Sequence, residues 1–443
     1  MIKVIFSTLA IFFAAVFPAS AYFEQINEFY LDNKLQVIVI ENHTAPIIKQ
    51  MLIYKTGAVD EELGKGGLAH LLEHLMFRGT KKISGNQFND LMEKNGAISN
   101  AFTSQDITAY HQFLSLDKLE LAMFAEADRM TGLLIKKDDF VTEQQIVLQE
   151  RKQRIDNEPT SKFYEIIKKT FWQNHPYSRQ ITGEESEIIN LSQNDALDFY
   201  KKYYTPNNAV LVLAGDIDVA TAKELAQKYY GSIKSGAPIE TKQFPILPQN
   251  YKSTVQMELD DIKLSRIIQI YGVPSFNYNK EQVYAYSVLA EYLGGDKNSP
   301  FYQKLVLKDK KAISLNVGYN PISRSMGIFE IMIIPVDNHD DTYSSWSKKA
   351  FNYAISQLDE NKLNNTKQKI LADLAYLEDS PNDIAMMVGN MAAVNIDIKE
   401  LHNYEANISK VTLEEVKQAA QYLQSVAPQV SGILYPKKEQ TDE

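Results

Sequence analysis

The sequence of 443 residues contains no cysteine. Disulfide bonds are therefore impossible, and any bound metal ion must be held by histidine and carboxylate side chains. Histidine is scarce as well, with seven residues in the whole chain. The search for a metal site is consequently confined to a few positions.

Positive charge and long hydrophobic segments are also in short supply. The chain carries 46 Lys and Arg against 56 Asp and Glu, a net charge of −10. This argues against nucleic acid as a partner, because phosphate binding requires a basic surface. Beyond the N-terminal segment no apolar run is long enough to span a bilayer, so we expect no stable membrane span. The composition is that of a globular protein, and the length indicates at least two domains.

The N-terminus has the pattern of a secretion signal. Lys3 precedes a mostly apolar run over residues 4–16, and Ala19-Ser20-Ala21 forms an A-x-A cleavage site. We predict a signal peptide over residues 1–21, which directs the mature protein across the inner membrane of a bacterium into the periplasm. An uncleaved N-terminal anchor is the less favoured alternative.

The most informative stretch is His70-Leu71-Leu72-Glu73-His74. Histidines four residues apart lie on one face of a helix, and Glu73 projects toward the same side. Two imidazole nitrogens beside a carboxylate suit zinc and proton transfer, in the order H-x-x-E-H that inverts the H-E-x-x-H pattern of zinc peptidases. The alternative is an amphipathic core helix that carries two histidines by chance. A third ligand decides between them.

Hydrophobic periodicity predicts the elements around this motif. In the first half we expect strands over residues 35–40, 47–54, 108–113 and 209–214, and helices from the motif to Gly79 and over 86–95, 117–133, 140–155, 195–203 and 219–230. In the second half we expect strands over 253–259, 265–271, 312–320, 327–334 and 430–434, and helices over 280–293, 341–358, 364–377 and 413–423. The mixture indicates an α+β protein.

The chain divides at a segment without periodicity. Residues 234–250 contain three prolines and are predicted to be a linker. We expect an N-terminal domain with the metal site over residues 22–233 and a second domain over 251–436, followed by a polar tail over 437–443.

The second half repeats the first in its order of elements. In this register Val288 and Tyr292 take the places of His70 and His74, so the second domain has no metal site of its own. The predicted fold is two homologous α/β-sandwich domains, each a mixed sheet with helices packed on it, that together form a clamshell.

A hydrolytic zinc site needs a third protein ligand and an open position. The other five histidines lie in turns, polar segments or a strand, and none has an informative setting: His43, His111, His175, His339 and His402. In the helix expected over 140–155, Glu143 and Glu150 share a face with apolar residues. Buried there, the two carboxylates would need a metal or hydrogen-bond partners. A solvated face with two ordinary glutamates is the alternative, and spacing alone leaves both readings open.

Several segments together carry a family resemblance. They are residues 67–77 around the motif, Asn100-Ala101-Phe102-Thr103 with Thr108 and Tyr110, Glu143 with Glu150, His175-Pro176-Tyr177, and residues 204–209 with Gly215-Asp216. In this order they resemble the pitrilysin-type (inverzincin) zinc metallopeptidases, in particular bacterial two-domain members related to the mitochondrial processing peptidase. The similarity covers most of residues 30–235, whereas the second half is similar in layout.

The resemblance implies a role for each matching residue. His70, His74 and Glu150 would bind one Zn²⁺ per chain, with Glu73 as the general base. Glu143 would orient one of the metal ligands. The segment Asn100, Ala101, Phe102 and Thr103 would form an edge strand that pairs with the backbone of a peptide substrate.

One expected feature is missing from the second domain. Many family members have an Arg and a Tyr there that hold the substrate carbonyl. Alignment of residues 304–306 with that stretch puts Val306 and Ile313 at the two positions, and Tyr319 and Arg324 are out of register. The substrate is held differently, the alignment is wrong, or activity is low.

The predicted function is a zinc-dependent endopeptidase acting on oligopeptides or unfolded polypeptide segments, with Glu73 as general base. The alternative is a non-catalytic partner subunit or peptide-binding protein of the same fold, because related assemblies pair an active chain with an inactive one. A homodimer or a pairing with a related subunit fits either reading. A phosphate-binding loop at Gly64-Lys65-Gly66-Gly67 is disfavoured because it lacks the P-loop spacing.

Overall fold

A computed structural model describes residues 26–85, 87–240, 244, 251–338 and 342–437 of the chain. The predicted signal peptide lies outside these residues, as do His339, most of the predicted linker and all but the first residue of the predicted tail. Within the described part, no helix combines the length and the apolar character that crossing a bilayer requires.

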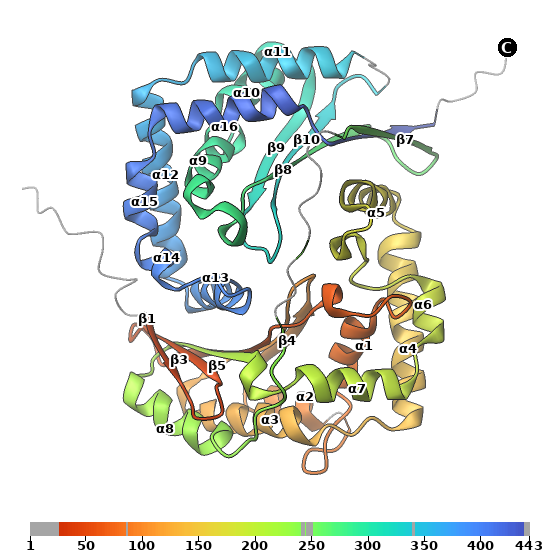
Figure 1. The fold of residues 1–443 in the computed structure, drawn as a ribbon, viewed down its shortest axis with the longest axis vertical. Helices are drawn as coiled ribbons and strands as arrows, with labels where there is room; N and C mark the ends of the chain where they lie inside the picture. Colours follow the sequence, from red (N-terminus) through yellow and green to blue (C-terminus); the bar gives the residue numbers. More distant parts are fainter. Residues whose placement is uncertain (1–25, 86, 241–243, 245–250, 339–341, 438–443) are drawn as a thin grey trace, which may run out of the picture.

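The first half is built on a six-stranded mixed sheet in the order β1-β2-β6-β3-β5-β4 (Figure 1). Its strands are β1 (Ile26–Tyr30), β2 (Gln36–Glu41), β3 (Ile47–Tyr54), β4 (Ile98–Thr103), β5 (Thr108–Ser115) and β6 (Ala209–Gly215). β2 and β6 are almost continuously apolar and buried on both faces, as the sequence predicted for residues 35–40.

The second half has a five-stranded sheet in the order β7-β11-β8-β10-β9. Its strands are β7 (Ser253–Leu259), β8 (Arg266–Val273), β9 (Ala312–Asn320), β10 (Gly327–Pro335) and β11 (Val430–Pro436). In the second sheet β7 and β11 pair in parallel, and in the first sheet β2 and β6 do so. Every other pair of neighbouring strands is antiparallel. The two halves therefore share one topology, with β1 as an extra edge strand in the first.

The helices of the first half include the one that carries the metal motif, and several of them pack on its sheet. They are α1 (Leu68–Leu75), α2 (Gln87–Lys94), α3 (Leu119–Gly132), α4 (Lys137–Arg151), α5 (Pro159–Trp172), α6 (Glu185–Asn190), α7 (Gln193–Tyr203) and α8 (Val219–Tyr230). α8 shows why they form: Asp218 accepts a hydrogen bond from the Thr221 N–H at 2.8 Å as the N-cap. Ala222, Ala226 and Tyr230 then bury one face at intervals of four residues.

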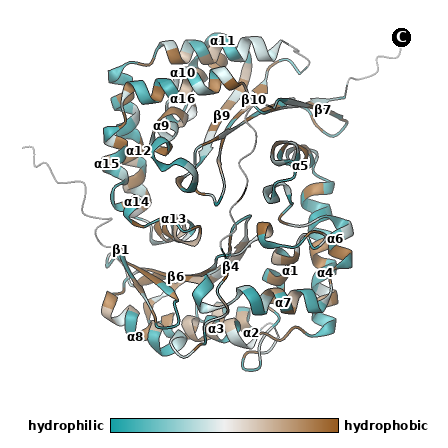
Figure 2. Ribbon diagram, in the orientation of Figure 1, coloured by the Kyte–Doolittle hydropathy of each residue, from teal (hydrophilic) through white to brown (hydrophobic). Residues whose placement is uncertain are grey.

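The second half has the helices α9 (Phe276–Gly294), α10 (Pro300–Tyr302), α11 (Tyr343–Ser356), α12 (Glu360–Glu378), α13 (Pro381–Ala393), α14 (Lys399–His402), α15 (Tyr404–Lys410) and α16 (Leu413–Val426). Figure 2 shows the strands of the first sheet mostly in hydrophobic colours, whereas peripheral helices such as α7 and α15 carry more hydrophilic ones. Val288 and Tyr292 on α9 are both buried in the second half's core.

Each half lends one helix to the other half's sheet. α13 packs on β3 and β6 of the first half, and α5 packs on β7 and β11 of the second. Glycine permits both contacts: a Cβ at Gly389 of α13 would lie 2.5 Å from Ile53 Cδ1, and one at Gly432 of β11 would overlap Ile167 of α5. Neither α5 nor α13 is among the helices predicted from the sequence, so the exchange between the halves is a new finding.

Candidate metal centre

The motif helix α1 begins at a position that only glycine fits. Gly67 has φ +82°, and a Cβ there would lie 2.6 Å from the carbonyl oxygen of Thr182. The buried carboxylate of Glu61 accepts hydrogen bonds from the N–H groups of Gly67 and Ala69 at 3.1 and 2.8 Å. Glu61 thus satisfies two free donors at the start of the helix.

The contact of Glu61 with α1 was not predicted from the sequence. Glu61 precedes Gly67 by six residues, so the chain must fold back to bring it there and no capping pattern marks it. An acidic residue shortly before the predicted helix was the one available signal.

The second contributing helix, α4, ends close to the motif. Residues 140–155 were predicted as one helix, and the structure shows α-helix to Arg151 followed by a π-helix over Lys152–Asp156. The buried Arg151 fixes this junction through ion pairs with Glu165 at 3.4 Å and Glu184 at 3.2 Å. Glu150 therefore precedes Arg151, whose position is fixed by these ion pairs, at the change from α-helix to π-helix. Such local changes of helix type are common at functional sites.

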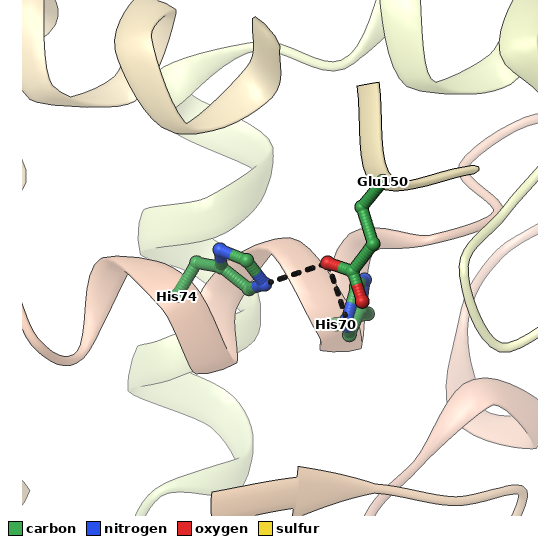
Figure 3. A group of neighbouring side chains, drawn as sticks. All are labelled: His70, His74 and Glu150. Carbon is green, nitrogen blue, oxygen red and sulfur yellow. Dashed lines mark ion pairs between the residues drawn. The ribbon is translucent and has the colours of Figure 1, made fainter. Parts of the chain in front are cut away.

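His70, His74 and Glu150 converge, with one donor atom from each within 4.8 Å of the others (Figure 3). Glu150 Oε2 lies 3.8 Å from His70 Nε2 and 3.4 Å from His74 Nε2. The other oxygen, Oε1, pairs with Arg154 at 2.6 Å. Among the described residues this is the only such group of three His, Asp or Glu side chains.

Glu143 holds the far side of one histidine. Its Oε2 lies 2.9 Å from His74 Nδ1, and its Oε1 pairs with Arg78. The Glu143 side chain is only 6% exposed, so the solvated-face alternative for this residue is wrong. The contact leaves His74 Nε2 as the nitrogen directed at Glu150, which is how an outer carboxylate orients a ligand.

The two histidines differ in protonation. Burial, together with the neighbouring His74, lowers the pKa of His70 to about 4. Burial also opposes the charged form of His74, but hydrogen bonds to Glu143 and Glu150 outweigh it and raise the pKa of His74 to about 9. A hydrogen bond from His74 contributes to holding the pKa of Glu150 below its usual range. Near pH 7 His70 is therefore neutral and His74 carries a proton.

Glu73 lies beside the cluster and faces strand β4. Its Oε2 accepts a hydrogen bond from the Thr103 hydroxyl at 2.6 Å. Burial raises the pKa of Glu73, and the hydrogen bond from Thr103 opposes that rise. A carboxylate with a raised pKa is suited to accept and return a proton near neutrality.

The predicted substrate strand is β4 itself. It forms one edge of the sheet and pairs with β5, and no described strand pairs with its other edge. Phe102 packs against the core shared between the halves, whereas the Asn100 side chain accepts a hydrogen bond from the Ala101 N–H at 2.9 Å. The structure thus places Asn100 to Thr103 along an open strand edge that ends at Glu73.

Neither second-domain alternative is free to hold a substrate carbonyl. Arg324 forms ion pairs with Asp60 and Asp106 of the first half, and the Tyr319 hydroxyl donates to the carbonyl oxygen of Pro274 at 2.6 Å. Val306 is partly buried against the core, and Ile313 is exposed. The described part of the second half therefore contains no Arg and Tyr pair at the predicted positions.

Three of the remaining histidines have other contacts. His111 lies 2.7 Å from Lys49 Nζ and is a satisfied sheet histidine, as expected. His43 lies 2.7 Å from Asp216, and His175 is buried beside Ser325 at 3.1 Å.

The donor set fits zinc. Two imidazoles and one carboxylate around an accessible position form the ligand set of many hydrolytic zinc sites. His70 is compatible with a metal ligand: the 3.8 Å from its Nε2 to Glu150 is too long for a hydrogen bond, and its lowered pKa of about 4 keeps the Nε2 lone pair available for a metal ion near pH 7.

Comparison with known proteins defines the class. Residues 36–185 match the family described as Insulinase (Peptidase family M16), and residues 190–370 match the Peptidase M16 inactive domain. The chain is 30% identical over 427 residues to the zinc protease PqqE of Helicobacter pylori, covering 94% of each chain. The protein therefore belongs to peptidase family M16, the pitrilysin-type family that its sequence resembles.

Solved structures share the same architecture. A protease from Helicobacter pylori superposes with a TM-score of 0.84 at 26% identity, covering 93% of this chain and 99% of that one. The first half of the periplasmic protease PqqL from Escherichia coli superposes with a TM-score of 0.78 at 18% identity, covering 93% and 92%. The fold is accordingly the two-sheet clamshell that the sequence predicted.

Proposed function

We propose that this protein is a zinc-dependent endopeptidase that cleaves oligopeptides or unfolded polypeptide segments. The observation that carries the proposal is the convergence of His70, His74 and Glu150 beside a partly buried Glu73. One Zn²⁺ per chain would be held by the three converging side chains, with Glu143 orienting His74.

A bound zinc ion would supply a Lewis acid for the scissile carbonyl and would lower the pKa of an attacking water. Glu73 accepts the proton of that water and later donates it to the leaving amine nitrogen. Thr103 fixes the carboxylate of Glu73 through the 2.6 Å hydrogen bond. Glu143, itself paired with Arg78, accepts a hydrogen bond from His74 Nδ1 and so leaves Nε2 directed at the centre.

The substrate would lie as an added strand along β4, the open edge that ends at Glu73. Such binding uses main-chain hydrogen bonds and depends little on side chains. It therefore suits peptides of varied sequence. The predicted signal peptide and the similarity to a periplasmic protease support a periplasmic location. A homodimer or a pairing with a related subunit remains part of this proposal.

Glu73→Gln tests the proposal directly. The variant should bind zinc as the wild type does, because Glu73 is not among the three converging ligands. Its rate should fall by at least about 100-fold, the usual contribution of a general base. Cleavage of a fluorogenic peptide and elemental analysis measure the two quantities, with the exposed Glu62→Gln as the matched control. Full activity of Glu73→Gln would refute the assigned role.

A second candidate is a non-catalytic partner subunit or peptide-binding protein. The observation that favours it is the engagement of Arg324 and Tyr319 in other contacts, which leaves no second-half pair to hold a carbonyl. A fluorogenic peptide mixture tested with and without a chelator separates the candidates. Binding without chelator-sensitive cleavage would favour the partner subunit.

A further inference from the structure

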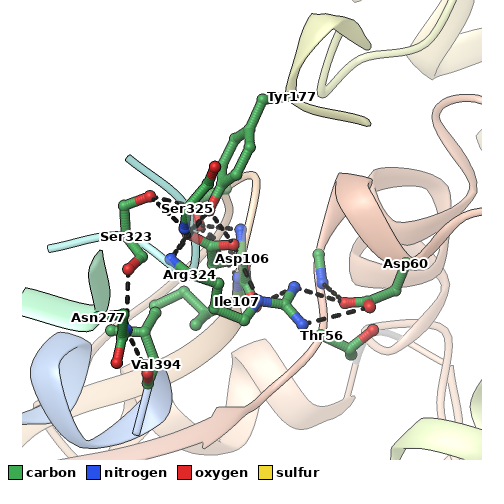
Figure 4. A network of polar contacts seen from close by, with 12 residues as sticks. Thr56, Asp60, Asp106, Ile107, Tyr177, Asn277, Ser323, Arg324, Ser325 and Val394 are labelled. Carbon is green, nitrogen blue, oxygen red and sulfur yellow. Dashed lines mark hydrogen bonds and ion pairs between the residues drawn. The ribbon is translucent and has the colours of Figure 1, made fainter. Parts of the chain in front are cut away.

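Arg324 connects the second half to two segments of the first half that lead to the metal centre (Figure 4). It lies in the turn between β9 and β10, and its side chain is 9% exposed. Its Nη1 and Nη2 donate to the two carboxylate oxygens of Asp60 at 3.3 and 2.7 Å. Its Nε donates to Asp106 Oδ1 at 2.9 Å. A guanidinium that engages a carboxylate through two nitrogens fixes both partners in orientation as well as distance.

The first segment leads from Asp60 to the motif helix. Asp60 ends the short 3₁₀ helix Ala58–Asp60, and its Oδ2 also accepts a hydrogen bond from the Gly57 N–H at 3.1 Å. The next residue is Glu61, whose carboxylate binds the first N–H groups of α1. A shift of Asp60 therefore moves the group that fixes the start of the helix bearing both histidines.

The second segment leads from Asp106 to strand β4. Asp106 lies in the turn after β4, three residues from Thr103, which holds Glu73. The two segments are also joined to each other, because the Ala58 N–H donates to the Ser104 carbonyl oxygen at 3.1 Å. Arg324 thus bonds simultaneously to the segment that positions α1 and to the turn that positions β4.

Tyr177 fixes the backbone of the turn between β9 and β10 that carries Arg324. Its hydroxyl donates to Asp106 Oδ1 at 2.6 Å and accepts a hydrogen bond from the Arg324 N–H at 3.0 Å. The side chains of Asp60 and Asp106 are 5% and 10% exposed. The whole contact is therefore shielded from solvent. In such a buried setting ion pairs are least screened and an unpaired charge is most costly.

We propose that Arg324 is a positioning residue for the catalytic centre of the opposite half. Through Asp60 and Asp106 it sets α1 relative to β4, and so sets the metal ligands relative to Glu73. A productive centre then requires contact between the halves at this turn. The inference rests on the proposed peptidase function where the effect is measured as kcat. Where the effect is measured as the absorption bands of bound Co²⁺, it rests on metal binding alone.

The test compares Arg324→Gln and Arg324→Lys with Tyr164→Phe in the full-length chain. Tyr164→Phe is the matched control, because it removes a different contact between the halves, the hydrogen bond from Tyr164 on α5 to Glu330 on β10. Three quantities are measured: kcat and KM on a fluorogenic peptide, the zinc dissociation constant, and the visible absorption bands of the Co²⁺-substituted protein, which report ligand geometry.

Arg324→Gln should lower kcat by about 10- to 100-fold, the usual effect of losing a residue that supports a metal site, with a smaller change in KM. Its cobalt bands should shift. Arg324→Lys keeps a charge but loses the two-nitrogen contact, so it should fall between Gln and wild type. Tyr164→Phe should retain wild-type kcat and cobalt bands.

A folded Arg324→Gln with wild-type kcat and cobalt bands would overturn the inference. Equal losses in Tyr164→Phe would also overturn it, because they would reflect contact between the halves in general. If Arg324→Gln does not fold, Arg324→Lys decides in the same way. If the wild type cleaves no peptide, the peptidase proposal fails, and the cobalt spectra still decide the role of Arg324.

Discussion

The proton on His74 predicts how zinc affinity depends on pH. In the metal-free chain His74 has a pKa of about 9, because its hydrogen bonds to Glu143 and Glu150 outweigh the effect of burial. His70, with a pKa of about 4, carries no proton near neutrality. Zinc must therefore displace one proton, from His74. Raising the pH removes this competitor, so the apparent affinity should increase with pH up to the pKa of His74 and level off above it.

The size of the effect follows from the same pKa. At pH 7 the apparent dissociation constant should be about 100-fold weaker than its limit at high pH, or about 2.7 kcal/mol. Between about pH 6.5 and 8.5 its logarithm should fall by about one unit per pH unit, with one proton released per zinc bound. Competition with a chromophoric chelator gives the slope, and calorimetry in buffers of different ionisation enthalpy counts the protons.

Glu143→Gln separates the two contributions of Glu143. Loss of its charge lowers the pKa of His74, so the pH dependence should flatten between about pH 7 and 8.5. Loss of its orienting contact should weaken the high-pH limit by about 10- to 100-fold. The exposed Glu62→Gln should change neither. A wild-type affinity independent of pH, a release of two protons, or an unchanged slope in Glu143→Gln would refute the assignment of the proton to His74.

Two further changes test the support of the centre. Gly67→Ala and Gly64→Ala both place alanine at φ +82°, but only the first meets backbone, at Thr182, while the second has nothing within 4 Å. Thermal unfolding should show that Gly64→Ala lowers the free energy of unfolding by about 1–2 kcal/mol. Gly67→Ala should lower it further and should also weaken zinc binding. Equal losses in the two variants would contradict the proposed contact. Thr103→Val removes the donor to Glu73 and should raise the pKa of that carboxylate, so the acid limb of kcat/KM against pH should move upward; an unmoved limb would show that Thr103 does not set this pKa.

Much of the candidate metal site could be predicted from local sequence patterns and the family resemblance. The spacing of His70 and His74 placed both imidazoles on one helical face, and the family resemblance pointed to Glu150 and Glu143 on a second helix. The structure brings these four side chains together. Glu61 escaped prediction because its contact with α1 depends on the path of a loop, and loop paths leave no periodic signal in the sequence.

Most strands and the repeat were also predictable, because alternation and apolar runs are local; the edge strand β1 was not predicted, and β4 was expected only from the family resemblance. The helices α5 and α13 were not predicted, although α5 has regularly spaced apolar residues. Their partners are strands of the opposite half, and Gly389 in α13 counts against a helix by propensity while it permits the close contact with Ile53. The engagement of Arg324 could not be foreseen either, since Asp60 and Asp106 are distant from it in sequence.

The exchange of α5 and α13 makes the two halves interdependent as folding units. Separated from its partner, the first half would expose the sheet face that contains Ile53 and Val212, and the second would expose the face around Gly432. Bare apolar sheet faces are prone to aggregation. The two halves share one topology, but neither completes its own hydrophobic core. Within the described residues the second half has no metal-ligand cluster, yet through α13 it completes the core over the sheet of the half that has one.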